Sequence, residues 1–250
     1  MKSQFSILCL LVNILLISCE QAPQYYEVSG RLHTPYHIKF EHTKPLDKEI
    51  DEQLKYFYHL FNAFDSTSVI SQVNQNRDIR VDTLFQKVFK KALEVSTETN
   101  GAYDVTCAPL INLWGFGFSR KDSVTPAHID SVRQFIGFQK VRLEGDRIVK
   151  DDPRLMMNFS SLADGTVCDM IAQMLEKKGV RNYLVEFGGE MRVKGVNPMG
   201  VDWRLGIAKP IDDADGMNQE WEQVVSFPRP LGMATSGNYR NFYIKDGRKY

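Results

Sequence analysis

The chain has 250 residues, of which 43% are hydrophobic and 25% charged, the balance of an ordinary folded protein rather than a disordered one. Lysine plus arginine and aspartate plus glutamate each number 31, so the formal net charge is zero. A nucleic-acid-binding protein needs a clustered basic excess, and this balance argues against nucleic acid as a partner. An anionic ligand would have to be held by local groups.

The first residues predict an export signal. A short basic start precedes residues 5–17, which are apolar except for Ser6 and Asn13. This run is too short to span a bilayer comfortably and is typical of the hydrophobic region of a signal peptide. It ends in Leu-Ile-Ser followed by Cys19, a sequence that resembles the lipobox of bacterial lipoproteins. A plain secretory signal and a short anchor helix are the alternatives.

The lipobox resemblance implies cleavage before Cys19 and lipidation of its sulfur. We therefore expect a lipoprotein signal peptide over residues 1–18, a tether over 19–29 and a folded domain over 30–250. The protein would be exported, anchored by its N-terminal lipid to a bacterial membrane, and would face the periplasm. Cys107 and Cys168 remain in the folded part, and their apolar or small neighbours predict two buried thiols rather than a disulfide.

Hydrophobic periodicity predicts the first elements of this domain. A strand over residues 36–40 precedes a helix with one apolar stripe, formed by Ile50, Leu54, Phe57, Phe61 and Phe64. A second helix is expected to open with a capping box at Thr83 and Gln86, to end at Asn100-Gly101, and to turn Leu84, Val88, Ala92 and Val95 inward. Residues 101–119 have no clear period and few charges, which indicates a buried or ligand-facing loop.

The remaining elements alternate between short helices and strands. We predict a helix over 126–135, a hairpin from 141–143 and 147–149, a strand over 155–159, a loop over 160–165 and a helix that ends at Gly179. Strand-like runs at 183–187, 191–193, 203–207 and 224–227 follow, with an exposed loop at 212–220 and a last hairpin that turns at 246–247. The pattern predicts one α+β domain with an antiparallel sheet and packed helices.

Four segments carry a resemblance to a known family. Residues 101–117 read GAYDVTCAPLINLWGFG and resemble the segment G-A-F-D-x-T-x-x-P-L-x-x-L-W-G-F-G of FAD:protein FMN transferases, the ApbE-like family. Residues 61–74 resemble F-S-x-Y-x-x-x-S-x-I-S-x-x-N, and residues 234–239 match A-T-S-G-x-Y. Residues 158–169, with 179–195, are similar to D-L-x-x-I-A-K-G-Y-x-x-D followed by G-G-D-I-R-V-x-G. The ordered matches span about residues 30–250 and imply a T-fold-related domain.

The resemblance implies an activity. Family members transfer FMN from FAD to a threonine hydroxyl of a target flavoprotein, release AMP and depend on magnesium. An FAD pyrophosphatase, in which water replaces the threonine, is one alternative, and it would release AMP without flavinylating a protein. A flavin-binding lipoprotein without catalysis is a second alternative, and a surface lipoprotein without flavin affinity is a third.

Two arguments predict which residues form an FAD site. Small residues at turns beside strands allow close backbone approach to a pyrophosphate, and they occur at Gly188, Gly189, Thr235, Ser236 and Gly237. The resemblance adds Ala102, Tyr103 and Asp104 as lining residues, Phe64 as an aromatic near the flavin, Leu32 and Tyr36 from a first motif, and Asn158 and Asp164 beside the metal. It places an oxygen ligand of magnesium at Ser161. Asp104 and Thr106 also have the spacing of a simple Asx turn.

The sequence departs from the family pattern at several positions. Asn158 stands where aspartate is usual, Asp164 where lysine or glutamate is common, and His33-Thr34 where the family has glycine. Asp169 is expected to brace the loop before its helix. Family members continue with S-H-I-I-D-P-x-T-G and D-A-x-x-T, the second of which supplies two more magnesium ligands. We therefore expect the C-terminal part of the domain to be missing, this chain to be nearly inactive, and a version extended through those motifs to transfer FMN.

Overall fold

The computed structural model describes residues 22–32, 34–117, 124–211, 220–237, 242–245 and 247–249. The expected signal peptide, Cys19, His33, residues 212–219 of the predicted exposed loop and Asn238 lie outside this part of the chain. The described fold is α+β, with antiparallel sheets and packed helices, as the sequence predicts. Within these residues, no helix has both the length and the apolar content needed to cross a membrane.

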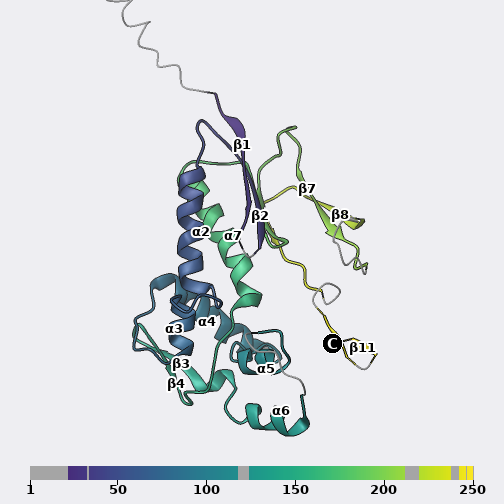
Figure 1. Cartoon of the computed structure of the whole chain (residues 1–250). Coiled ribbons are helices and arrows are strands. Elements are labelled where there is room, and N and C mark those ends of the chain that lie inside the picture. Colours follow the sequence, from purple (N-terminus) through teal and green to yellow (C-terminus); the bar gives the residue numbers. More distant parts are fainter. Residues whose placement is uncertain are drawn as a thin grey trace, which may run out of the picture.

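A five-stranded antiparallel sheet forms the upper part of the molecule in Figure 1. Its strands lie in the order β1 (Gln24–Arg31), β2 (Pro35–His42), β5 (Tyr183–Phe187), β6 (Glu190–Lys194) and β9 (Leu231–Met233). The expectation of a tether over residues 19–29 is wrong from Gln24 onward, because β1 pairs with β2 along its whole length and satisfies its backbone hydrogen bonds there.

Two long helices, α2 (Asp47–Phe61) and α7 (Ser160–Lys177), lie side by side and pack on one face of the sheet. Along β5, alternate residues are buried in the core that these helices share with the sheet, as the two-residue period of a strand requires. The predicted stripe on α2 is confirmed except at Phe64, which is 70% exposed. The helix stops before Phe64 because Asn62 takes an extended backbone conformation.

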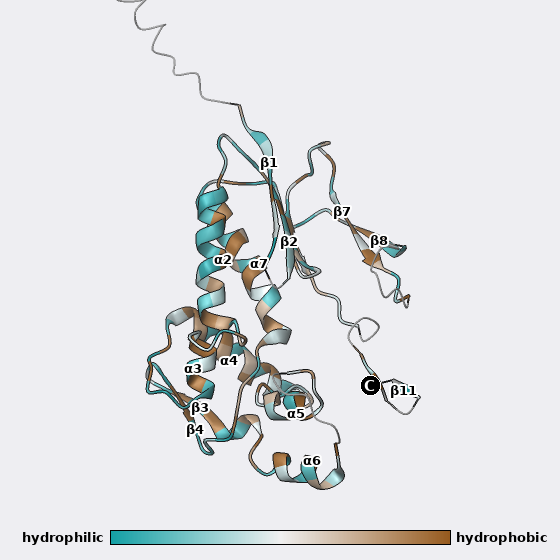
Figure 2. Cartoon of the chain, in the orientation of Figure 1, coloured by the Kyte–Doolittle hydropathy of each residue, from teal (hydrophilic) through white to brown (hydrophobic). Residues whose placement is uncertain are grey.

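The opposite face of the sheet carries a smaller cluster. The hairpin of β7 (Trp203–Ala208) and β8 (Trp221–Phe227) contributes Trp203 and Leu205, which pack with Val193 of β6. Figure 2 shows mixed hydropathy along this hairpin, with hydrophilic residues reaching its outer end. The predicted antiparallel strands of the second half are therefore confirmed.

Another long helix and several shorter elements form the lower part of the molecule in Figure 1. They are α3 (Val69–Asn74), α4 (Thr83–Glu98), α5 (Ala108–Leu113), α6 (Pro126–Arg133), the 3-10 turn η1 (Phe138–Lys140), β3 (Val141–Glu144) and β4 (Arg147–Lys150). β10 (Ile244–Lys245) and β11 (Arg248–Lys249) form the last hairpin, close to the C-terminus. α6 and both hairpins confirm the sequence predictions.

The start of α4 differs from the prediction by one residue. Asp82 caps the helix, because its carboxylate accepts a hydrogen bond from the backbone N–H of Phe85. The predicted capping box at Thr83 is therefore wrong. The buried face consists of Phe85, Val88, Phe89, Ala92 and Ser96, whereas Leu84 and Val95 are only half-buried.

Three segments between the long helices also differ from the predictions. Residues 101–117 contain α5 and are not entirely loop. Residues 155–159 form no strand, and only Met156 makes an isolated bridge, to Cys107. The predicted loop over 160–165 is the first part of α7. Cys107 and Cys168 are unpaired, and Cys168 is the buried thiol of the two.

Candidate functional site

A cavity of about 830 Å³ opens between the first half of α7, strand β6 and the segment that follows β9. Its lining includes Ser160, Ser161 and Asp164 from α7, Glu190 from β6, and Thr235 and Ser236 after β9. The structure thus brings together Ser161, Asp164, Thr235 and Ser236, which the sequence proposed from separate segments. Gly237 follows directly but does not line this cavity.

The start of α7 gives the cavity a partial positive charge. Four N–H groups at the beginning of any helix lack partners within the helix, and the helix dipole adds to their effect. At this helix start the N–H of Ser160 donates to Oδ1 of Asn158 at 2.7 Å, and the N–H groups of Leu162 and Ala163 donate to the Phe159 carbonyl, both at 2.8 Å. This helix end therefore offers a ligand mainly its dipole and its hydroxyl groups. Ser160 and Ser161 are exposed to the cavity and add two hydroxyl groups. This arrangement suits a phosphate or pyrophosphate group.

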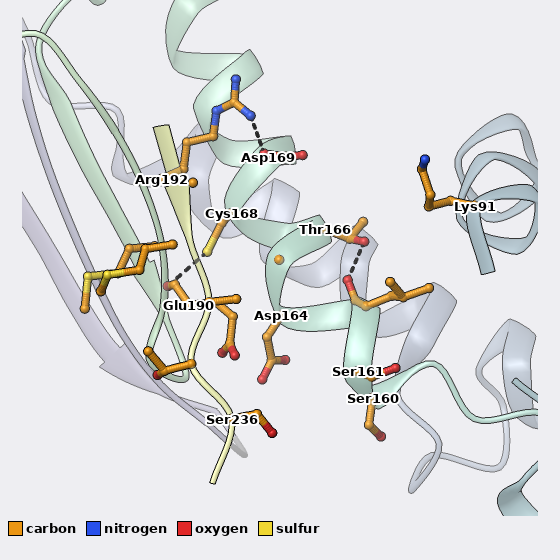
Figure 3. A pocket seen from close by; sticks show the side chains of 17 residues that line it. Lys91, Ser160, Ser161, Asp164, Thr166, Cys168, Asp169, Glu190, Arg192 and Ser236 are labelled. Carbon is orange, nitrogen blue, oxygen red and sulfur yellow. Dashed lines mark hydrogen bonds and ion pairs between the residues drawn. The ribbon is translucent and has the colours of Figure 1, made fainter. Parts of the chain in front are cut away.

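Two carboxylates face the same cavity, as Figure 3 shows for Asp164 and Glu190. Within the described part of the chain, neither side chain forms a hydrogen bond or an ion pair with another residue. Burial raises the pKa of both carboxyl groups, and the charge of Asp164 raises that of Glu190 further. Neighbouring half-buried carboxylates without a partner favour a bound cation or a proton between them.

The Gly188-Gly189 turn joins β5 to β6 beside these carboxylates. Both glycines have positive φ angles, 68° and 101°, which a tight hairpin turn requires. Their N–H groups already donate within the protein, from Gly188 to the Pro35 carbonyl at 3.0 Å and from Gly189 to a Glu186 carboxylate oxygen at 2.9 Å. Both N–H groups are therefore used within the protein, and close backbone approach to a pyrophosphate at this turn stays a prediction.

Gly188 is instead a point of close approach to Asp164. A Cβ atom at Gly188 would lie 2.8 Å from Oδ2 of Asp164 and 2.7 Å from the Thr34 methyl group. A Cβ atom essentially never makes contacts this short, so any larger residue at Gly188 would have to displace the Asp164 carboxylate, the Thr34 methyl group or both. The absence of a side chain at Gly188 therefore decides where this carboxylate can sit.

Asp104 has a structural role in the described fold. Its Oδ1 accepts hydrogen bonds from the N–H and hydroxyl of Thr106, at 2.8 and 2.6 Å, and its Oδ2 accepts from the N–H of Phe138, at 3.0 Å. The Asx-turn interpretation of the spacing is thus confirmed. These bonds tie the loop before α5 to the start of η1.

Tyr103, in the same loop, lies near the side chain of Ser161. Its hydroxyl is buried and has no hydrogen bond of good geometry to the residues that the structure describes. Burial raises the pKa of Tyr103, although the nearby Ser161 side chain lowers it in part. The neighbouring Ala102 is exposed.

A second cavity, of about 230 Å³, adjoins the first and shares Ser160 and Asp164 with it. Its walls include Thr34 and six aromatic side chains, those of Phe57, Tyr58, Phe61, Phe64, Phe159 and Phe187. Tyr36 stacks on Phe187 at its edge, with ring centroids 6.3 Å apart. Leu32 is 48% exposed and lines neither cavity. A pocket of this composition suits a flat ring system.

Sequence reasoning missed Glu190 and most of the aromatic cavity. Glu190 stands at the acid of the G-G-D-I-R motif, so the signal was present in the matched segment. The aromatic walls come from α2, β5 and the start of α7, and only the folded chain brings them together. Asp169 was expected to brace a loop, and this is wrong: its carboxylate pairs with Arg192 of β6 at 2.6 Å.

The described residues include no group of three or more histidine, cysteine, aspartate and glutamate side chains arranged to hold a metal ion. The donors that do face the cavity are oxygens, from Asp164, Glu190 and Ser161. Hard divalent cations such as magnesium prefer oxygen ligands and are often shared with substrate phosphates. An anionic ligand beside two carboxylates would also repel them unless a cation lay between, so the residues present fit magnesium.

Comparisons with known proteins agree with this geometry. A sequence model of the ApbE family matches residues 32–250. A *Vibrio cholerae* protein named FAD:protein FMN transferase is 35% identical over 95% of this chain and 73% of its own length. The *Salmonella typhimurium* protein of the same name is 30% identical over 96% of this chain and 74% of its own. A solved flavin transferase ApbE from *Vibrio cholerae* superposes with a TM-score of 0.75, at 34% identity, over 89% of this chain and 74% of that one.

The α+β fold is thus that of a group of proteins whose named members are flavin transferases. The chain belongs to the ApbE family. The resemblance that the sequence motifs indicate is therefore confirmed.

Proposed function

We propose that this chain is an FAD:protein FMN transferase that uses magnesium and a threonine hydroxyl as acceptor. The observation that carries the proposal is the cavity at the start of α7, where serine hydroxyls and the positive end of the helix dipole face two carboxylates that have no partner among the described residues. The adjoining aromatic cavity, which shares Ser160 and Asp164, supports a ligand that combines phosphates with a flat ring. The names of its relatives support the same activity.

Binding would divide FAD between the two cavities. The pyrophosphate would lie against the α7 start, with the hydroxyls of Ser160 and Ser161 on one side and those of Thr235 and Ser236 on the other. A ring of the ligand would enter the aromatic cavity. Asp164, Glu190 and an oxygen of Ser161 would hold magnesium, which supplies positive charge to the pyrophosphate when bound.

In the reaction one phosphorus–oxygen bond forms and another breaks. The acceptor threonine oxygen bonds to the phosphorus of the FMN half, the bond to the bridging oxygen breaks, AMP leaves, and the hydroxyl proton passes to a base. Such a reaction needs mainly alignment and charge neutralisation from the protein. The chain's own residues align the phosphates through α7 and restrict water through the aromatic walls.

The test mixes FAD, magnesium and a small flavoprotein domain that carries the acceptor threonine with the purified protein and, separately, with a version extended through the family's C-terminal motifs, which we expect to be the more active of the two. Covalent flavin on the domain and AMP in equal amount, measured by mass spectrometry and chromatography, would support the proposal. A domain with valine in place of that threonine is the matched control. AMP without covalent flavin would instead identify an FAD pyrophosphatase, and flavin binding without AMP a non-catalytic flavin protein.

A further inference from the structure

The segment that enters α7, residues 155–159, belongs to no helix and to no paired strand. Among the described residues its only sheet-like contact is the isolated bridge between Met156 and Cys107. Buried backbone groups need partners, and in this segment side chains from elsewhere supply several of them. We call residues 155–159 the entry segment.

The side-chain amide of Asn74 binds the centre of the entry segment in two directions. Its Oδ1 accepts from the N–H of Met157 at 2.8 Å, and its Nδ2 donates to the carbonyl of Met157 at 2.9 Å. The amide thus takes the place of a residue on a neighbouring strand. Asn74 is the last residue of α3 and the final asparagine of the motif matched over residues 61–74.

Lys150, the last residue of β4, binds both the entry segment and Asn74. Its half-buried ammonium group donates to the carbonyl of Leu155 at 2.8 Å and to the carbonyl of Asn74 itself at 3.2 Å. The N–H of Asn158 donates to the carbonyl of Val105 at 2.8 Å. Residues 155–158 are therefore held by groups from positions 74, 105 and 150, of which the first two are distant in the sequence.

The entry segment leads directly into the proposed site. Its last residue, Phe159, is a wall of the aromatic cavity and the N-cap of α7. Ser160 and Ser161, the next two residues, line the large cavity. Met157 lies only three to four residues before these groups. A displacement of its backbone would therefore reach them along a segment that no sheet holds in place.

We infer that Asn74 is a positioning residue for the FAD site, which it serves by clamping the entry segment and so fixing the start of α7, with Ser160, Ser161 and Asp164, relative to Glu190 of β6. Lys150 assists from the opposite side. The inference rests on the proposed function only in naming FAD as the ligand. The claim that Asn74 holds residues 157–163 in place does not depend on that function.

The test compares Asn74→Ala and Asn74→Asp with a control at Leu205, in the small cluster on the other face of the sheet. The Leu205 substitution, Val or Ala, is chosen to lower the melting temperature as much as Asn74→Ala does. Hydrogen exchange of residues 157–163 is read by mass spectrometry, and FAD affinity with magnesium by calorimetry. Asn74→Asp keeps an acceptor for the Met157 N–H but loses the donor, so it should show an intermediate effect.

We expect Asn74→Ala to speed exchange over residues 157–163 and to weaken FAD binding by about tenfold, the effect of one or two lost hydrogen bonds. The Leu205 control should change neither by more than about twofold, since Leu205 lines neither cavity and does not contact the entry segment. Equal effects of Asn74→Ala and the control on FAD affinity, or unchanged exchange over 157–163, would overturn the inference. If wild type binds no FAD, the proposed function fails, while the exchange measurement still decides the role of Asn74. If Asn74→Ala does not fold, Asn74→Asp replaces it in the comparison.

Discussion

Asp164 is a residue of this site that lowers the stability of the protein when no ligand is bound. Its carboxylate is half-buried, faces Glu190 and has no partner among the described residues, and its pKa is raised by burial. A carboxyl group whose pKa is higher in the folded protein than in the unfolded chain binds more protons when folded. Stability therefore falls as pH rises from about 4 through the folded value, and the full cost is present at neutral pH.

We expect Asp164→Asn to raise the melting temperature at pH 7 by about 2 to 4 °C, which corresponds to about 1 kcal/mol in a chain of this size. The gain should shrink as the pH is lowered toward 4, because the wild-type carboxyl becomes neutral. Scanning calorimetry without magnesium, at pH 7 and pH 4.5, measures the difference. Asp130→Asn, at an exposed position, is the control and should leave the melting temperature nearly unchanged. A lower melting temperature for Asp164→Asn at pH 7 would contradict the prediction.

Lys150 is expected to respond to pH in the opposite sense. Burial lowers the pKa of its amine from 10.5 to about 8, so between these values the unfolded chain binds more protons than the folded protein. The stability of wild type relative to Lys150→Met should therefore increase as pH rises from 8 to 10. Because the amine is only half-buried, we expect this stability difference to grow by about 1 kcal/mol, less than the whole pKa shift would give. Urea unfolding of both proteins at pH 7.5 and pH 10 tests this, and a constant difference between them would rule it out.

Individual residues were predictable from the sequence to different degrees. Ser161, Asp164, Thr235 and Ser236 lie together as the family motifs imply. Asp104 and Gly188 also match the motifs, but their polar groups are occupied by internal hydrogen bonds. A motif shows which residues recur together, whereas the destination of each hydrogen bond depends on segments that meet only in the fold.

At the scale of elements, the β5–β6 hairpin offers a matched pair of substitutions. Gly188→Ala and Gly189→Ala both place a side chain on backbone with positive φ, and each should destabilise the protein by about 1 to 2 kcal/mol. Only Gly188 has neighbours, Thr34 and Asp164, within 3 Å of the added methyl group, whereas Gly189 faces open space. We therefore expect FAD binding with magnesium to weaken for Gly188→Ala and to stay near wild type for Gly189→Ala.

Calorimetric titration of both variants at a temperature well below their melting points makes this comparison. Equal affinities in the two variants would show that the position of Asp164 has no influence on the ligand. A loss of affinity in Gly189→Ala alone would mean that the turn itself contacts FAD.

Elements whose partners are near in sequence were predicted well, and those held from a distance were not. The β3–β4 and β7–β8 hairpins and α6 agree with their hydrophobic patterns, because each depends mainly on local pairing or capping. Residues 155–159 have the composition of a strand, but a side chain, Asn74, holds their centre. Periodicity reports which face is buried and does not report what supplies the hydrogen bonds.

At the scale of the whole molecule, the open question is where the protein resides. We propose that it is an exported lipoprotein attached to a bacterial membrane through Cys19, because this cysteine directly follows the apolar run of the first residues. Expressed in a bacterial host, wild type should be cleaved before Cys19 and gain the mass of a lipid. Cys19→Ala should lose the lipid and leave the membrane fraction. Intact-mass analysis of membrane and soluble fractions decides this, and an unlipidated wild type cleaved elsewhere would refute it.

The order of strands in the large sheet has a consequence for how the chain reaches this structure. β2 pairs with β1 within a few residues, but its other neighbour, β5, lies about 140 positions later, after every helix of the described fold. At ribosomal rates of roughly 5 to 20 residues per second, the β1–β2 hairpin would wait on the order of ten seconds for that neighbour to be synthesised. During this interval one edge of β2 is open to pairing with other chains. Folding should therefore be slow and sensitive to concentration, and a holding chaperone should raise its yield more than its rate.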